Sequence, residues 1–202
     1  MPTDFDAAAR TWDTPERSDR AHRLCAAMVG AVPVLPTWRA ADVGCGTGQL
    51  GRALIAHVAH VILVDTSAGM LAVAAEQADD AERFSILNHD LSDAPLPHPV
   101  DLLVSAMALH HVPDTAAFLT HARASLTRGG WIALADLDAD PDNHFHDDDF
   151  DGHRGIDRHA LVRSLRDLGF VDVAQRTATT VVKPKDGVDH THELFLVTGR
   201  LP

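Results

Sequence analysis

Short, nearly continuous apolar runs alternate along the chain with longer stretches in which Ala and Leu recur at helical spacing. Runs of this kind are typical of strands that are covered on both faces, as in a parallel sheet. We expect strands at Arg39–Val43, Val61–Asp65, Phe84–Asn88, Val100–Ser105 and Trp131–Asp136. The helices expected between them are Gln49–Ala59, Gly69–Ala78 and Thr115–Leu126. These helices are long enough to be right-handed crossovers, so the pattern predicts an α/β protein.

The two ends of the chain have different patterns. From Asp4 to Met28 the periodicity is helical, with Arg17, Arg20 and Arg23 along one stripe. The pattern predicts one helix ahead of the first strand.

Near the C-terminus, Asp157 can cap a helix over Arg158–Leu168. Two further runs follow, Val171–Val182 and Glu193–Arg200, joined by an expected loop over Lys183–Thr191. Because this loop is too short for a helical crossover, the two runs should pair antiparallel. The prediction is a mostly parallel seven-stranded sheet with one antiparallel strand.

Composition narrows the possible partners. The 202 residues include 29 acidic and 17 basic side chains, a net charge of −12, and Lys183 and Lys185 are the only lysines. A phosphate backbone is held by clustered basic residues, so neither nucleic acid nor an anionic membrane is an expected partner. Cys25 and Cys45 cannot form a disulfide framework, and no long apolar run is present. We expect a soluble cytoplasmic protein, and no pattern indicates its oligomeric state.

The negative charge is concentrated in one segment. Asp136–Asp151 contains eight aspartates and no Lys or Arg. A stretch of this composition cannot form a core, so we expect a solvated, mobile lid after the fifth strand. His144, His146 and His153 have metal-ligand chemistry, but a flexible loop supplies no fixed geometry, and we expect no metal site.

A glycine-rich turn follows the first expected strand. Glycines at 44, 46 and 48 let the backbone turn sharply and let a ligand approach closely. Asp65 ends the second strand, 23 residues after Asp42, near the spacing at which a carboxylate meets a ribose in nucleotide-binding folds. Asp90 follows the third strand, where it could accept a hydrogen bond from an adenine amine.

Two longer segments, taken with Asp65 and Asp90, resemble a known family. They are Asp42-Val43-Gly44-Cys45-Gly46-Thr47-Gly48 and Asp101-Leu102-Leu103-Val104-Ser105-Ala106-Met107-Ala108-Leu109-His110-His111-Val112. In this combination the chain strongly resembles the class I S-adenosylmethionine-dependent methyltransferases of the small-molecule type, over almost its whole length. The resemblance implies a single Rossmann-like, three-layer domain with a helical cap over residues 1–36 and a cofactor-binding half over 37–136. An acidic loop over 137–157 and a C-terminal helix with its strand pair over 158–202 would complete it.

The resemblance also implies roles for individual residues. The glycine turn would pack on the methionine part of S-adenosylmethionine, with Asp42 near its amino group. Asp65 would bind the ribose hydroxyls, Asp90 and the Leu91 amide would recognise adenine, and Met70 would pack on the ring. The whole expected cofactor-binding set is Asp42, Gly44, Cys45, Gly46, Gly48, Asp65, Thr66, Met70, Asp90, Leu91, Ser105 and Ala106.

Methyl transfer mainly requires alignment and desolvation, and some acceptors also require a base. His110, His111 and Asp136 are the candidates, because they lie at the carboxyl edge of the sheet where ligands bind. The family's motif for amino groups of nucleic acids is missing at Ser105-Ala106-Met107-Ala108, and its paired-glutamate loop for protein arginines is missing as well. A small acceptor remains, apolar or cationic.

Two other functions remain open. One is a cofactor-binding protein without catalysis. The other is a nucleotide-dependent oxidoreductase, although its short-chain form needs a catalytic tyrosine and the chain contains none.

Overall fold

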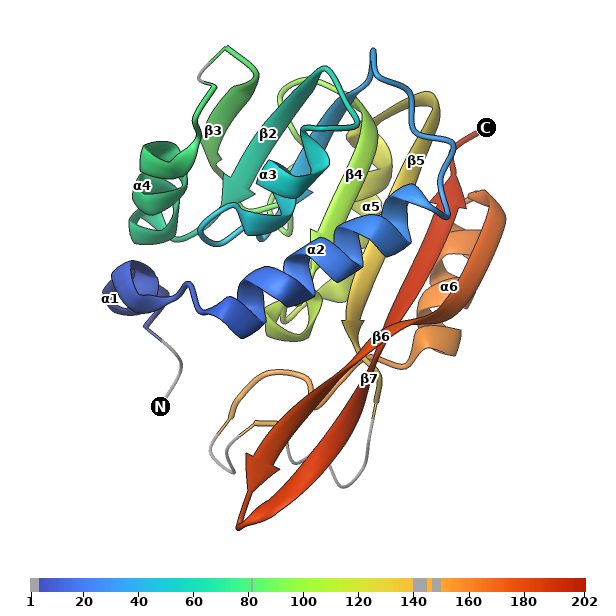
Figure 1. The fold of residues 1–202 in the computed structure, drawn as a ribbon. Coiled ribbons are helices and arrows are strands. Elements are labelled where there is room, and N and C mark those ends of the chain that lie inside the picture. The colour runs from blue at the N-terminus through green and yellow to red at the C-terminus, as the bar shows by residue number, and fades with distance from the viewer. Residues whose placement is uncertain (1–3, 81, 140–144, 147–149) are drawn as a thin grey trace.

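The computed structural model describes residues 4–80, 82–139, 145–146 and 150–202. Their strands are β1 (Arg39–Val43), β2 (His60–Asp65), β3 (Phe84–Asn88), β4 (Val100–Ala106), β5 (Leu126–Leu137), β6 (Val171–Lys185) and β7 (Val188–Arg200). They form one sheet in the order β3-β2-β1-β4-β5-β7-β6 (Figure 1). Only β7 runs against its neighbours, pairing antiparallel with both β5 and β6. The predicted sheet, with one reversed strand, is therefore confirmed.

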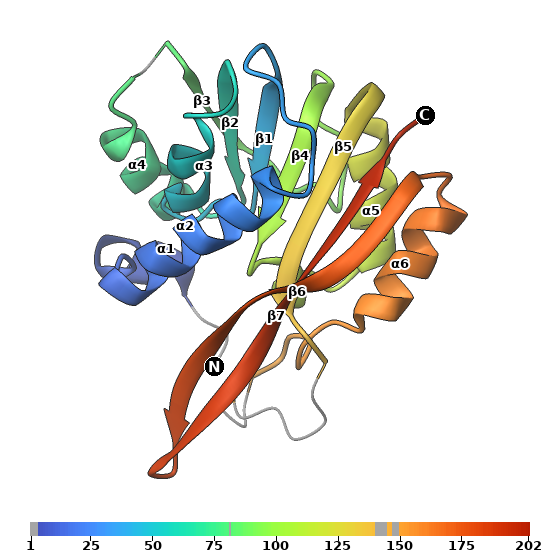
Figure 2. The ribbon, with the colours of Figure 1, turned by 45° about the vertical axis from the view of Figure 1, so that its right-hand side comes forward.

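Helices cover both faces of the sheet (Figures 1 and 2). They are α1 (Phe5–Ala8), α2 (Pro15–Val29), α3 (Gln49–Leu54), α4 (Ala68–Gln77), α5 (Thr115–Ala124) and α6 (Arg158–Asp167), with 3₁₀ turns η1 (Ala9–Thr11) and η2 (Leu109–His111). Alternate strand residues face opposite layers, as the pleat requires. Leu102 packs with the α2, α3 and α4 side of the core, whereas Leu103 packs with the α5 and α6 side.

The N-terminal segment is not the single helix that its periodicity predicts. It breaks at Trp12, Asp13 and Thr14, and α2 begins afresh with the Thr14 side chain accepting a hydrogen bond from the Arg17 N–H. Pro15 occupies the first turn of α2, where its missing N–H costs nothing. The break allows α1 and η1 to fold back against α4 while α2 crosses the sheet.

The prediction of a loop over Lys183–Thr191 is also wrong. β6 and β7 continue through most of it and turn only at Asp186 and Gly187, with φ of 53° and 77°. An Asp-Gly pair with both φ values positive forms the tight turn that matches the twist of a hairpin. The hairpin extends beyond the sheet (Figure 2), and Arg23 of α2 donates to Thr179 Oγ1 near its base.

Several expected boundaries shift by a few residues. α3 ends at Leu54 rather than at Ala59, and β5 begins at Leu126. The central part of the predicted acidic lid, residues 140–144 and 147–149, lies outside the described residues.

Candidate active site

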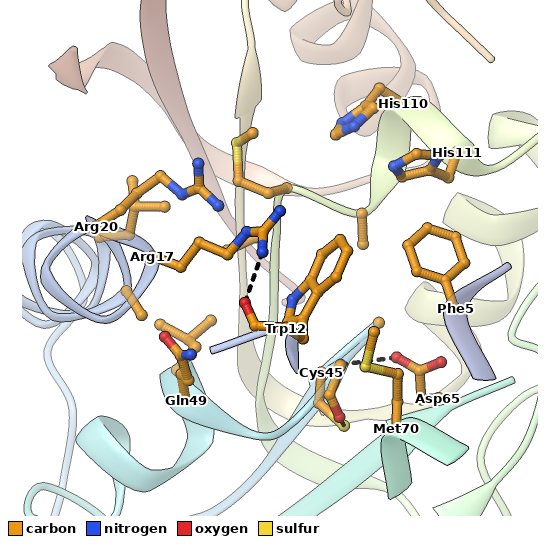
Figure 3. A pocket seen from close by; sticks show the side chains of 18 of the residues that line it. Phe5, Trp12, Arg17, Arg20, Cys45, Gln49, Asp65, Met70, His110 and His111 are labelled. Carbon is orange, nitrogen blue, oxygen red and sulfur yellow. Dashed lines mark hydrogen bonds between the residues drawn. The ribbon is translucent and has the colours of Figure 1, made fainter. Parts of the chain in front are cut away.

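A cavity of about 1040 Å³ opens at the carboxyl ends of β1, β2 and β4, where open α/β sheets bind ligands. Its walls come from the glycine turn, the N-terminal segment, α2, η2 and the β6–β7 hairpin (Figure 3). The expected cofactor residues among its lining are Gly44, Cys45, Gly46, Asp65, Thr66, Met70, Asp90, Leu91 and Ala106. Its volume is at the upper end of ordinary ligand pockets, so it can hold two small molecules side by side.

The glycine turn is fixed by backbone geometry. Gly44, Gly46 and Gly48 all have positive φ, at 71°, 54° and 80°. At Gly44 a Cβ would lie only 2.4 Å from the Cβ of Ala108, so no larger residue fits there. The Gly46 N–H donates to Oδ2 of Asp65 at 2.8 Å, which ties the turn to the end of β2.

Asp65 lies at the glycine-turn end of the cavity. Its Oδ1 accepts the Ser67 N–H at 2.9 Å, so each carboxylate oxygen has one backbone donor and is held in place. Half-buried and lining the cavity, the carboxylate keeps lone pairs for further donors. Met70 is buried beside it, and Leu91 is buried behind the exposed Asp90.

Asp42 is placed differently from what the sequence suggests. It is 1% exposed and is not among the cavity-lining residues, and its Oδ2 accepts the Gly51 N–H at 2.8 Å. Burial, and secondarily the charge of Asp65, raise its pKa to about 7, although the Gly51 hydrogen bond opposes this. Gly48 and Ser105 also lie outside the cavity lining, and the Ser105 hydroxyl has no partner among described residues.

Cys45 lines the cavity but is not a thiolate. Burial is the main cause that raises its pKa well above the ordinary value, and the charges of Asp42 and Asp65 add to the effect. A protonated thiol is a poor nucleophile, in agreement with a packing role for this residue.

The N-terminal segment covers the glycine-turn end of the cavity. Asp6 accepts hydrogen bonds from the Ser67 hydroxyl and, at 2.7 Å, from the Gly69 N–H at the start of α4. Asp13 accepts from Thr47 and Gln49. Next to these two anchors in the sequence, Phe5 and Trp12 lie in edge-to-face contact and pack against Met70 (Figure 3).

His110 and Asp136 form a buried pair at the other end of the cavity. Nδ1 of His110 lies 2.5 Å from Asp136 Oδ1, and the His110 backbone N–H donates to Oδ2 at 3.1 Å. The side chains are 2% and 1% exposed. His110 lines the cavity, and its Nε2 has no hydrogen-bond partner among the described residues. Asp136 is not among the lining residues, so it can act on a bound molecule only by way of its hydrogen bond to His110.

Neutral aromatic rings complete this end of the cavity. Burial, followed by the charge of His110, lowers the pKa of His111 to about 4, and burial likewise lowers that of His146 to about 3. His146 stacks on Phe150 with centroids 3.7 Å apart, while His111 meets Phe5 edge to face at 5.1 Å. His146, which the sequence assigns to a solvated loop, is therefore part of the wall.

Arginines on α2 are further lining residues to which the sequence assigned no function. Arg17 and Arg20 come from the expected arginine stripe and point into the cavity (Figure 3). Their spacing of three residues places them on one helix face, but nothing in the sequence showed that this face meets the glycine turn.

Neither a metal cluster nor a membrane helix is found in the described part of the chain. No three His, Cys, Asp or Glu side chains gather there in a metal-binding arrangement. His144 is outside the described residues, and His153 Nε2 is 2.9 Å from the Val112 carbonyl oxygen. None of the described helices has the length and apolar character needed to span a bilayer.

Comparison with known proteins gives a consistent result. Residues 40–130 match a family model described as a methyltransferase domain. A trans-aconitate 2-methyltransferase of Methylobacterium nodulans is 36% identical over 65% of this chain and 49% of its own length. An uncharacterised methyltransferase of Mycobacterium tuberculosis is 35% identical over 54% of this chain and 55% of its own. A pyochelin synthetase of Pseudomonas aeruginosa is 34% identical over 50% of this chain, which matches only 6% of that protein. The chain thus spans about half the length of the two methyltransferases and a small part of the pyochelin synthetase.

Solved structures agree on the fold. The methyltransferase of Haloferax volcanii in complex with the activator Trm112 superposes with a TM-score of 0.77 at 22% identity, covering 98% of both chains. Magnesium protoporphyrin IX methyltransferase of Synechocystis, solved with bound S-adenosylmethionine, superposes with a TM-score of 0.64 at 19% identity, covering 92% of this chain and 80% of its own.

Proposed function

Because this chain carries a methyltransferase domain in the class I fold, we propose that it transfers a methyl group from S-adenosylmethionine to a small-molecule acceptor. One observation supports this above the others. A single cavity joins the glycine turn and Asp65 at one end to the buried His110–Asp136 pair at the other. A candidate nucleoside site and a candidate proton acceptor thus share one cavity.

The lining of the cavity fits the cofactor. The free lone pairs of Asp65 suit the two ribose hydroxyls, and the open backbone at Gly44 and Gly46 suits the methionine part. Asp90 and the Leu91 amide would take the adenine edge. Asp42 would act from behind the turn, through the Gly51 backbone to which it is bonded. Once bound, the cofactor supplies an electrophilic methyl group on a sulfonium.

The acceptor end supplies alignment and a place for a proton. Trp12, Phe5 and the neutral His111 exclude water, which favours a reaction that removes the charge of a sulfonium. His110 is the proton acceptor when the nucleophile is a hydroxyl or a protonated amine, because its Nε2 is the ring nitrogen that has no hydrogen-bond partner among the described residues. Asp136 is a positioning residue, since its bond to Nδ1 sets the tautomer and the orientation of the ring.

A small acceptor agrees with the volume and walls of the site. The N-terminal segment forms one wall and the β6–β7 hairpin another, and the cavity of about 1040 Å³ has room for the cofactor and a small molecule. A binding protein without catalysis would not need the His110–Asp136 pair, and a short-chain oxidoreductase would need a tyrosine that the chain lacks.

The test is transfer of labelled methyl from S-adenosylmethionine into fractions of a small-metabolite extract, with S-adenosylhomocysteine release as a second readout. We expect label in at least one fraction with the wild-type protein and none with Asp65→Asn. Firm binding of S-adenosylhomocysteine without transfer to any fraction would favour the non-catalytic alternative. Firm binding of NAD in its place would favour the oxidoreductase.

A further inference from the structure

Three arginines of α2, Arg17, Arg20 and Arg23, line the cavity, and Arg23 forms an ion pair with Asp19 at 2.9 Å. Arg17 and Arg20 lie one turn apart on α2 and project into the space opposite His110 and His111 (Figure 3). Arg17 is already engaged, because it donates to the Trp12 carbonyl at 2.6 Å and its guanidinium lies 4.0 Å from the centre of the Trp12 ring. Arg20 has neither a hydrogen bond nor an ion pair with any described residue.

The surroundings of Arg20 leave its charge uncompensated. Burial, and secondarily the charge of Arg17, lower its pKa, while the negative charge of Asp136 acts in the opposite direction. Asp136 does not neutralise it, since that carboxylate is bonded to His110 and to the Leu137 N–H. Guanidinium groups stay protonated in proteins, so Arg20 is a partly buried cation whose donors point into the cavity. Such a cation is costly to bury unless an anion completes the site.

We propose that Arg20 binds an oxyanion of the methyl acceptor, so that the substrates of this enzyme are small acids, with a carboxylate as the simplest group. The inference rests on the proposed function. It replaces the apolar or cationic acceptor expected from the sequence, because Arg20 places a cation without a described partner in the wall of the cavity. The planar guanidinium is suited to a carboxylate through two parallel hydrogen bonds.

The cofactor carries a carboxylate of its own, which is the other possible partner. Arg17 and Arg20 differ in their position relative to the glycine turn, and this difference indicates which carboxylate each would bind. Arg17 is attached to Trp12, whose indole nitrogen is 3.7 Å from the Cβ position of Gly46 in the glycine turn. Arg20 lies one turn further along α2, and its guanidinium lies farther from Trp12 and the glycine turn than that of Arg17 does (Figure 3). Arg17 is therefore assigned to the cofactor side and Arg20 to the acceptor side.

The experiment measures binding by calorimetry to protein saturated with S-adenosylhomocysteine. The probes are phenylacetate, cinnamate, succinate and tricarballylate, each paired with its primary amide. We expect at least one acid to bind roughly tenfold or more tightly than its amide, and Arg20→Gln to abolish that preference. The matched control is Arg163→Gln, an exposed arginine of α6 whose carboxylate partner Asp157 is 3.8 Å away, and it should keep the preference.

A second titration separates the two sources of carboxylate. Arg20→Gln should bind S-adenosylhomocysteine within about twofold of wild type. A tenfold loss for S-adenosylhomocysteine, with unchanged affinity for 5′-methylthioadenosine, which lacks the amino-acid part, would assign Arg20 to the cofactor and overturn the proposal. A panel in which no acid binds better than its amide would overturn it as well. Failure of the methyltransferase assignment has a different signature, because wild-type protein would then not bind S-adenosylhomocysteine at all.

Discussion

Replacing Asp42 by asparagine should stabilise the cofactor-free protein at neutral and alkaline pH. The Asp42 carboxyl is fully buried and receives one backbone hydrogen bond, from Gly51. An asparagine has nearly the same shape and its side-chain oxygen can still accept that bond. What the substitution removes is the cost of ionising a buried acid.

The size and sign of the effect follow from the pKa. Burial raises the pKa of Asp42 from 3.8 to about 7 in the folded protein. The folded state therefore holds a proton that the unfolded state has already lost, and stability falls as the pH rises from about 4 through 7. At about 1.4 kcal/mol per pKa unit, the full penalty is ~4 kcal/mol, of which roughly 2.5 kcal/mol develops between pH 5 and pH 8.

The assay is urea unfolding of wild type and Asp42→Asn at several pH values, with the difference between the two proteins plotted against pH. In this difference of unfolding free energies, the contributions of the other titrating groups cancel because both proteins contain them. We expect Asp42→Asn to gain stability relative to wild type as the pH rises. Asp79→Asn, at an exposed position, is the matched control and should show a flat difference. A flat difference for Asp42→Asn as well would refute the reasoning.

The remaining predictions concern catalysis and the glycine turn. His110→Gln should lower kcat by about 10²-fold or more, while Asp136→Asn should lower kcat with little change in KM. An unchanged kcat in His110→Gln would show that this imidazole moves no proton. Gly44→Ala should destabilise the fold by roughly 1–3 kcal/mol in thermal or urea unfolding, because φ is 71° and the new methyl would meet Ala108. A variant as stable as wild type would mean that the turn is free to shift.

The sheet could be predicted because each of its strands and turns is encoded by residues that are neighbours in the sequence. Strands β1, β2 and β4 are buried on both faces and read as short apolar runs, and glycines with positive φ mark the turn after β1. The acidic residues that follow the strands must then gather at the carboxyl edge, which is why Asp65 and Asp90 both line the cavity.

What could not be predicted depends on contacts between distant segments. The helical periodicity before Trp12 continues after it, so only the packing of α1 on α4 reveals the break. The pairing of His110 with Asp136 joins residues 26 positions apart and depends on the neighbouring ends of β4 and β5. Arg20 is one of three similar arginines in the sequence, and only the crossing of α2 over the sheet turns it toward the site.

The Asp-Gly turn of the hairpin is an exception, because its signal was present in the sequence. The pair Asp186-Gly187 is typical of a two-residue hairpin turn, yet the polar residues around it favoured a loop. The exposed Val182 and Val188 alternate with polar neighbours, which is the pattern of a solvated hairpin rather than of a buried strand.

The most direct test of the central claim is calorimetric titration of S-adenosylhomocysteine into wild type and Asp65→Asn. We predict saturable binding at one site per chain, weakened roughly tenfold or more in Asp65→Asn, because the ribose hydroxyls lose a charged acceptor. Unfolding curves of both proteins, with Asp79→Asn as the exposed control, would show that the variant is folded. Equal affinity in wild type and Asp65→Asn, or no binding by folded wild-type protein, would contradict the account.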